Sequence, residues 1–144
     1  MRAWQTVVVG VDGSESSRRA LVWAVEEARG HRTRLTVVMA WTPPPPPVGP
    51  GYGSLRGYEE ADFEAVAERQ LTGAVAAVVG DDADIVVERV LVEGPAAPRL
   101  IDASAEADLV VVGSRGHGGF TGMLLGSVSN HVVAHAHCPV VVVR

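Results

Sequence analysis

The stretch that decides the fold reads Ala107-Asp-Leu-Val-Val-Val-Gly-Ser-Arg-Gly-His-Gly-Gly-Phe-Thr-Gly-Met-Leu-Leu-Gly-Ser-Val-Ser129. Its apolar run, Leu109 to Val112, is rich in β-branched residues and predicts a buried parallel strand. A glycine-rich loop follows Gly113 and leads to Ser127, where a helix can begin. Glycines allow the main chain to approach a ligand closely, and the N-terminus of a helix attracts anions. The stretch therefore predicts a loop that holds phosphate groups.

Working outward from this stretch, apolar runs and helical patterns alternate along the whole chain. The patterns predict strands at residues 6–11, 34–41, 85–92, 109–112 and 140–143. They predict helices from the 12–16 turn to about residue 29, and at 58–79, 95–105 and 127–136, with Gly30 as the stop signal of the first. Alternating strands and helices indicate an α/β fold: a doubly wound, Rossmann-like parallel sheet of five strands, with helices on both faces.

Two loops of this predicted sheet come at the carboxyl ends of strands. Asp12 follows the first strand, which ends at Val11, and Gly113 follows the fourth. Ligands of open α/β sheets bind at the carboxyl ends, where the winding direction reverses. If the first and fourth strands are neighbours, the two loops face each other across a crevice, which is a second reason to place a binding site there.

The length, charge and cysteine content of the chain limit its possible domain number, partners and location. The 144 residues suggest a single domain, 1–144, and the formal net charge of −5 argues against nucleic acid or a membrane surface as a partner. One cysteine, Cys138, excludes an internal disulfide and fits a reducing compartment. The start of the chain has no signal-peptide pattern, and no apolar run approaches the roughly 18 residues of a membrane helix. The expected location is the cytoplasm.

A Pro/Gly-rich loop at residues 42–57 interrupts the domain between the second strand and the second helix. Five consecutive prolines, Pro43 to Pro47, favour polyproline II and exclude a helix or central strand. We expect a stiff surface connection. A proline-rich docking motif is the alternative, although flanking basic residues are lacking.

The glycine spacing resembles the signature of a known family. Gly113, Gly116 and Gly126 followed by Ser127 fit G-x2-G-x9-G-[ST], the ATP-binding signature of universal stress proteins. A Walker A loop would need Gly-Lys-Ser/Thr, and the dinucleotide fingerprint a different spacing. The resemblance extends over the whole chain and implies a sheet of order 3-2-1-4-5, ATP binding with Mg²⁺, and a homodimer paired through the last strand.

The resemblance also implies which residues form the binding site. Asp12 would lie near the ribose and phosphates or a metal ion, Ala40 would pack on adenine, and Arg115 would supply charge to a phosphate. The full binding set that it implies is Val11, Asp12, Ala40, Val112, Gly113, Arg115, Gly116, Gly126, Ser127, Val128 and Ser129. Two alternatives stay open: Asp12 could be the N-cap of the first helix, and Arg115 could be solvated.

No convincing catalytic set accompanies this loop. We therefore expect a nucleotide-dependent, stress-response binding module whose downstream partner is unknown, with a slow ATPase or a cAMP-binding protein as alternatives. A histidine and cysteine group near the end of the chain could suggest a metal site, but the favoured interpretation is that His135 and His137 interact with the carbonyls at the helix C-terminus and that Cys138 is a buried small hydrophobe. The group consists of His131, His135, His137 and Cys138, and His117 in the loop could touch phosphate.

Overall fold

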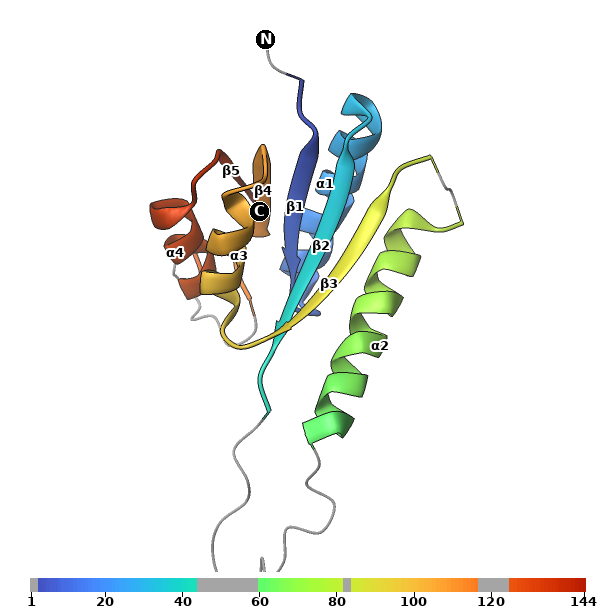
Figure 1. Cartoon of the computed structure of the whole chain (residues 1–144), viewed down its shortest axis with the longest axis vertical. Helices are drawn as coiled ribbons and strands as arrows, with labels where there is room; N and C mark the ends of the chain where they lie inside the picture. The colour runs from blue at the N-terminus through green and yellow to red at the C-terminus, as the bar shows by residue number, and fades with distance from the viewer. Residues whose placement is uncertain (1–2, 44–59, 82–83, 117–124) are drawn as a thin grey trace, which may run out of the picture.

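The computed structural model describes residues 3–43, 60–81, 84–116 and 125–144. Its elements follow one another as β1 (Thr6–Val11), α1 (Glu15–His31), β2 (Arg34–Trp41), α2 (Glu60–Val79), β3 (Val87–Glu93), α3 (Ala96–Ser104), β4 (Leu109–Gly113), α4 (Ser127–His135) and β5 (Val140–Val143). The strands form one sheet in the order β3-β2-β1-β4-β5, and every pairing is parallel (Figure 1). The predicted fold class and strand order are confirmed.

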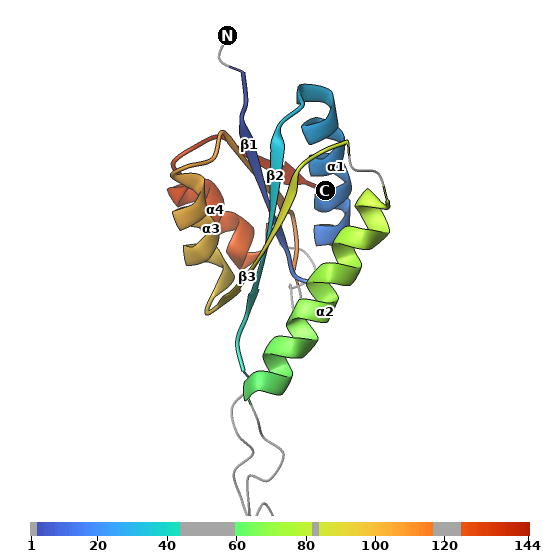
Figure 2. The ribbon, with the colours of Figure 1, turned by 45° about the vertical axis from the view of Figure 1, so that its right-hand side comes forward.

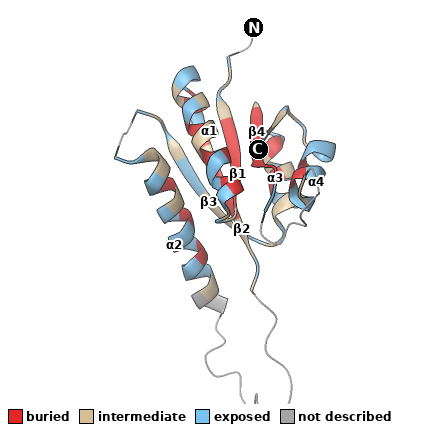
Figure 3. Ribbon diagram, turned by 180° about the vertical axis from the view of Figure 1, so that it is seen from behind, coloured by how far each residue is buried: buried red, intermediate tan, exposed pale blue. Residues whose placement is uncertain are grey.

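The central strand β1 is buried from both sides because helices cover both faces of the sheet. Val7 and Val9 pack into the layer under α1 and α2, and Val8 into the layer under α3 and α4 (Figure 2). Burial of all three valines explains the unbroken apolar run of this strand. Figure 3 shows the buried residues concentrated along β1, β4 and the inner sides of the helices.

The first helix ends later than Gly30, so the predicted stop at this glycine is wrong. The helix continues to His31, and Arg32 takes the left-handed conformation with φ 53°. The backbone N–H of Thr33 then donates to Ala28 O at 3.0 Å, which closes the last turn. The reversal falls here because the next residue, Arg34, must pair with the start of β1.

Other element boundaries shift by one or two residues. β3 begins at Val87 rather than residue 85, and Pro95 is the N-cap of α3 rather than its first helical residue. α1 passes the predicted end by two residues, and α3 and α4 each end one residue early. Residues 44–59, with most of the proline segment and the expected helix start at 58, lie outside the described residues. None of the helices in the described ranges is both long and apolar enough to cross a membrane.

Replacing Gly30 by alanine should stabilise the protein. An added Cβ meets no atom within 4 Å, and the residue lies inside α1. Alanine loses less backbone entropy on folding, so we expect a gain of about 0.5–1 kcal/mol in the free energy of unfolding. Chemical denaturation measures the gain, and a lower midpoint for Gly30→Ala would contradict the position of this residue within the helix.

Candidate functional site

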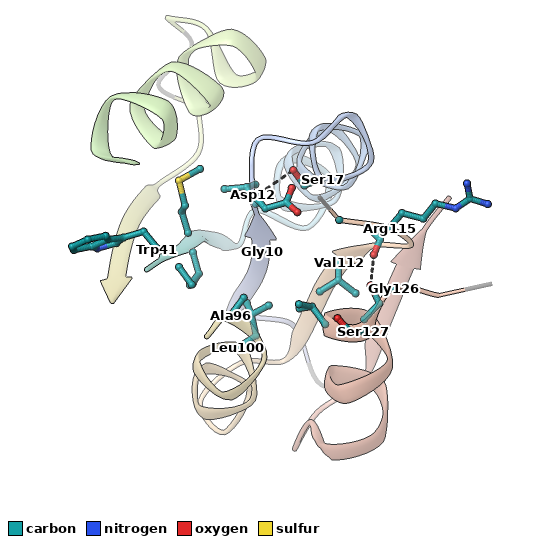
Figure 4. A pocket seen from close by; sticks show the side chains of 18 of the residues that line it. Gly10, Asp12, Ser17, Trp41, Ala96, Leu100, Val112, Arg115, Gly126 and Ser127 are labelled. Carbon is teal, nitrogen blue, oxygen red and sulfur yellow. Dashed lines mark hydrogen bonds between the residues drawn. The ribbon is translucent and has the colours of Figure 1, made fainter. Parts of the chain in front are cut away.

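A cavity of about 460 Å³ lies at the carboxyl ends of β1, β2 and β4. Every residue of the predicted binding set lines this one cavity, whose walls Figure 4 shows from close by. Residues far apart in the sequence, such as Val11 and Ser129, are therefore brought to one place. The structure thus shows that these residues line one cavity, and the role of each toward a ligand stays a prediction.

The Asp12 turn forms one edge of the cavity. Asp12 Oδ1 accepts a hydrogen bond from the Ser14 backbone N–H at 2.9 Å, and Gly13 turns the chain with φ 84°. Ser14, rather than Asp12, is the N-cap of α1, since its Oγ accepts from the Ser17 N–H at 3.1 Å. The first turn of α1 is thus supplied with a side-chain acceptor, and the Asp12 carboxyl lines the cavity instead of capping the helix.

Gly113 owes its identity to packing between β4 and α1. A Cβ at this position would lie 2.5 Å from Ser16 Oγ and 2.8 Å from the Ser16 carbonyl carbon and oxygen. Ser16 Oγ also accepts from the Arg115 N–H at 3.1 Å, which fastens the start of the loop to the helix. The predicted ligand role of this glycine is accompanied by a structural one that the motif did not reveal.

Gly116 brings the loop directly against the Asp12 turn. A Cβ on Gly116 would lie 2.8 Å from Asp12 Oδ2, which is the end of a side chain rather than backbone. The two loops that the sequence predicted to face each other across a crevice therefore meet. Their meeting places a carboxylate and a glycine backbone on the same wall of the cavity.

The N-terminus of α4 opens on the cavity without a side-chain cap. Its N-cap is Gly126, whose N–H donates to Ser114 O at 2.7 Å and whose carbonyl accepts the first helical bond, from Asn130. Ser127 and Val128, the first two helical residues, are exposed. Because glycine carries no side-chain oxygen, no side-chain cap among the described residues occupies the N–H groups of this first turn.

The side chains of Ser129 and Arg115, two predicted phosphate ligands, are not directed into the cavity. Ser129 is buried, and its hydroxyl donates to Gly113 O at 2.5 Å, so it fastens α4 to β4 rather than offering its hydroxyl to the cavity. Arg115 lines the cavity but is exposed, and its side chain extends away from the cavity in Figure 4. Backbone N–H groups, the exposed Ser127 and the Asp12 carboxyl are thus among the polar groups on this side of the cavity.

An apolar wall, largely missed by the sequence analysis, completes the cavity. Trp41, at the end of β2, follows the predicted Ala40, and Leu100 lies across the cavity on α3 (Figure 4). Further residues of the cavity that the sequence analysis missed include Gly10, Ser17, Val38, Met39, Ala67, Gln70 and Ala96. Trp41 could have been predicted as a cavity residue, because it lies at the carboxyl end of a strand. Helical periodicity alone does not show which residues of α2 border the cavity.

The histidines and the cysteine lie apart from this cavity. His131 Nδ1 is 2.9 Å from Ser127 O, and its ring centroid is 6.3 Å from that of His135. Across the described ranges, no group of three or more His, Cys, Asp or Glu side chains could hold a metal ion. Burial, and then the charge of Asp108, raise the pKa of the Cys138 thiol, which keeps it protonated and weakly nucleophilic. His117 lies outside the described residues.

The packing role of Gly113 predicts a difference between two alanine variants. Gly113→Ala should lower the free energy of unfolding by about 1–3 kcal/mol, because its Cβ meets the backbone of α1. Gly116→Ala should change stability much less, because the Asp12 carboxyl can rotate away. Urea denaturation of both variants tests this, and equal losses would contradict the assigned roles.

Comparisons with known proteins agree with this geometry. A sequence model described as the universal stress protein family matches residues 3–144. A universal stress protein of Mycobacterium tuberculosis is 43% identical over 141 residues, covering 96% of this chain and 45% of the relative. The chain spans about half the length of the curated relatives it matches.

Solved structures extend the comparison. A universal stress protein in complex with cAMP is 31% identical, with a TM-score of 0.73 and coverage of 99% of this chain and 98% of that one. The universal stress protein UspA from Lactobacillus plantarum has a TM-score of 0.76 over the full length of both chains. At 22% identity, the second likeness shows the fold alone.

Proposed function

Since this chain belongs to the universal stress protein family, we propose that its cavity binds an adenine nucleotide. The observation that carries the proposal is the uncapped N-terminus of α4 beside an apolar wall, at the carboxyl ends of the central strands. A nucleotide offers the matching chemistry, with anionic phosphate at one end and an apolar aromatic base at the other. The likeness to a universal stress protein in complex with cAMP supports this choice.

The phosphate end of the proposed ligand would lie on the first turn of α4. The N–H groups of Ser127 and Val128 begin the helix, and Gly126 leaves room for an oxyanion in front of them. The helix dipole adds a partial positive charge at this end. Because the Arg115 side chain extends away from the cavity, the backbone would carry most of this interaction.

The nucleoside end would lie against the apolar wall. Ala40 and Val112, which the family resemblance implied near the nucleoside, line the cavity together with Trp41. An indole ring is well suited to stack on a base or to cover its edge. Ligand pockets commonly combine such a wall with a few convergent polar groups, and their volumes of roughly 300–1,000 Å³ include that of this cavity.

Asp12 supplies the one carboxyl among the lining residues in the described ranges, and no histidine lines the cavity there. The resemblance implies ATP with Mg²⁺, and an oxygen donor such as Asp12 suits that ion, which the nucleotide phosphates would share. With no further acid or base on the cavity wall, we propose a binding module rather than a dedicated ATPase. The downstream partner of the module is not specified by these residues, and the cytoplasm stays its expected location.

The second candidate ligand is cAMP, and the structural neighbour in complex with cAMP is the observation that favours it. Its phosphodiester carries a single charge and needs no metal ion, so Asp12 would be less important. Competition between ATP with Mg²⁺ and cAMP in one calorimetric titration ranks the two ligands. Mutual displacement would show that they share the cavity.

A carboxylate at the N-cap of α4 should block the phosphate end while preserving the helix. In Gly126→Asp, the new side chain has room, since the nearest atoms to its Cβ lie at 3.5 Å, and it caps the helix. We expect stability to be kept or raised by a few tenths of a kcal/mol. Nucleotide affinity should fall at least tenfold, because the carboxylate occupies and repels the phosphate position.

Gly126→Asn is the matched control, because it caps the helix without the charge. We expect an affinity between those of wild type and Gly126→Asp for both ATP with Mg²⁺ and cAMP, as measured by isothermal titration calorimetry. Wild-type affinity in Gly126→Asp would place the phosphates elsewhere. An absence of heat with the wild-type protein and either nucleotide would refute nucleotide binding itself.

We also propose a homodimer through β5, as the family resemblance implies. β5 lies at the sheet edge, where Pro139 O accepts a hydrogen bond from the N–H of Val110 in β4, and Val143 O accepts one from the N–H of Ser114 just after β4. Alternation along the strand then directs the backbone N–H of Val142 to the open side. An open strand edge is a ready partner for a second copy of the same edge.

Proline at position 142 should separate the proposed dimer without breaking the sheet. Val142→Pro removes an outward N–H that β4 does not use, whereas Val142→Ala keeps it. We expect sedimentation to give twice the 15.1 kDa chain mass for wild type and Val142→Ala, and a lower mass for Val142→Pro. A monomeric wild-type protein at high micromolar concentration would contradict the proposal.

A further inference from the structure

A second hollow lies at the opposite pole of the sheet from the nucleotide cavity. Its volume is about 580 Å³, and its lining includes Arg29, Arg32, Thr33, Arg34 and Asp84. These residues surround the amino ends of β1 and β2, at the pole where the chain enters β1 (Figure 1). Because parallel strands direct all their carboxyl ends to the other pole, the two sites share no residue.

The charge of this hollow is positive in a chain of net charge −5. Arg29 is held by Asp84, with Nε 3.1 and 3.2 Å from the two carboxylate oxygens, and it also donates to Val79 O at 3.3 Å. The exposed side chains of Arg32 and Arg34 have no ion pair within the described ranges. Among the described residues, two guanidinium groups are therefore without an ion pair beside one paired arginine.

A buried hydroxyl between these two arginines lacks a partner. Thr33 is 5% exposed, and its Oγ1 is the one buried side-chain polar atom without a hydrogen bond in the described residues. Buried polar atoms are almost always satisfied, and leaving one unpaired is costly. The same residue lines the hollow, but its hydroxyl oxygen is enclosed by protein atoms, so the unpaired group is a local cost of this wall and not a contact for a ligand.

The backbone of Arg32 adds a third, independent observation. This arginine occupies the left-handed position after α1, with φ 53°, where glycine fits without strain. No other described residue apart from glycines has positive φ. A strained position that nevertheless carries a long cation suggests that the side chain has a use.

We propose that the hollow binds a phosphate group, with Arg32 and Arg34 as the two cations that contact it. Planar guanidinium groups match phosphate geometry, and a phosphate dianion balances two positive charges. The phosphate is either free or carried by a small organic molecule. This site goes beyond the proposed nucleotide cavity and stands independently of it.

Amide chemical shifts locate phosphate binding directly. We expect sodium phosphate, compared with sodium chloride at equal ionic strength, to shift the amides of residues 29–34 and 84–86 in a saturable manner. A second titration with glycerol 3-phosphate distinguishes free from organic phosphate, according to which of the two binds more tightly. Shifts confined to residues 113–116 and 126–129, or no saturable shifts, would overturn the proposal.

Variants then test the three observations separately. Arg32→Gly removes a guanidinium and relieves the left-handed backbone, so it should raise the melting temperature in phosphate-free buffer and lower phosphate affinity roughly tenfold or more. Thr33→Val should likewise stabilise the unliganded protein but leave phosphate affinity unchanged, because the hydroxyl is enclosed, and Arg34→Gln should weaken binding alone. Arg18→Gln, an exposed charge on another part of α1, is the control and should bind like wild type.

Retention of wild-type phosphate affinity in Arg32→Gly or Arg34→Gln would refute the assignment. So would a loss of the same size in Arg18→Gln, because binding would then follow total charge. Neither result bears on the nucleotide cavity, which is measured with its own ligands and its own variants.

Discussion

The close approach of β4 to the first turn of α1 is the contact on which the site depends. No side chain fits between Gly113 and the Ser16 backbone, and Ser16 Oγ holds the next stretch of loop through the Arg115 N–H. From the other side, the Ser129 hydroxyl fastens α4 to the same Gly113 through its carbonyl oxygen. One glycine therefore positions two helices and the start of a loop around a common opening.

Two helix N-termini border that opening, and they differ in one chemical detail. Ser14 supplies α1 with a side-chain acceptor, whereas Gly126 leaves the first turn of α4 without one. An anion has a reason to bind at the second terminus and less reason at the first. The difference between serine and glycine at two N-caps thus explains how the phosphate end of a nucleotide would be directed to α4.

The alternation of apolar runs and helical patterns was sufficient to predict the fold class, and the family resemblance that rests on the glycine spacing indicated part of the residues that line the cavity. What the sequence could not show depends on tertiary contacts. Gly30 does not end α1 because the chain must turn where β2 can pair, and Arg32 takes the left-handed position instead. Ser129 and Arg115 have the residue types of phosphate ligands, but the Ser129 hydroxyl donates to Gly113 O, and the exposed Arg115 side chain extends away from the cavity. Trp41 was missed because a motif spaced along one loop carries no information about the opposite wall.

The central claim is that an adenine nucleotide binds here with its phosphate on the uncapped turn of α4. A crystal structure of the protein grown with ATP and Mg²⁺, and a second grown with cAMP, tests that claim most directly. The account predicts phosphate oxygens within hydrogen-bonding distance of the Ser127 and Val128 amide nitrogens, with the base against the wall that includes Trp41. A nucleotide bound with its phosphates away from this turn, or a cavity left empty at saturating concentrations of both ligands, would contradict it.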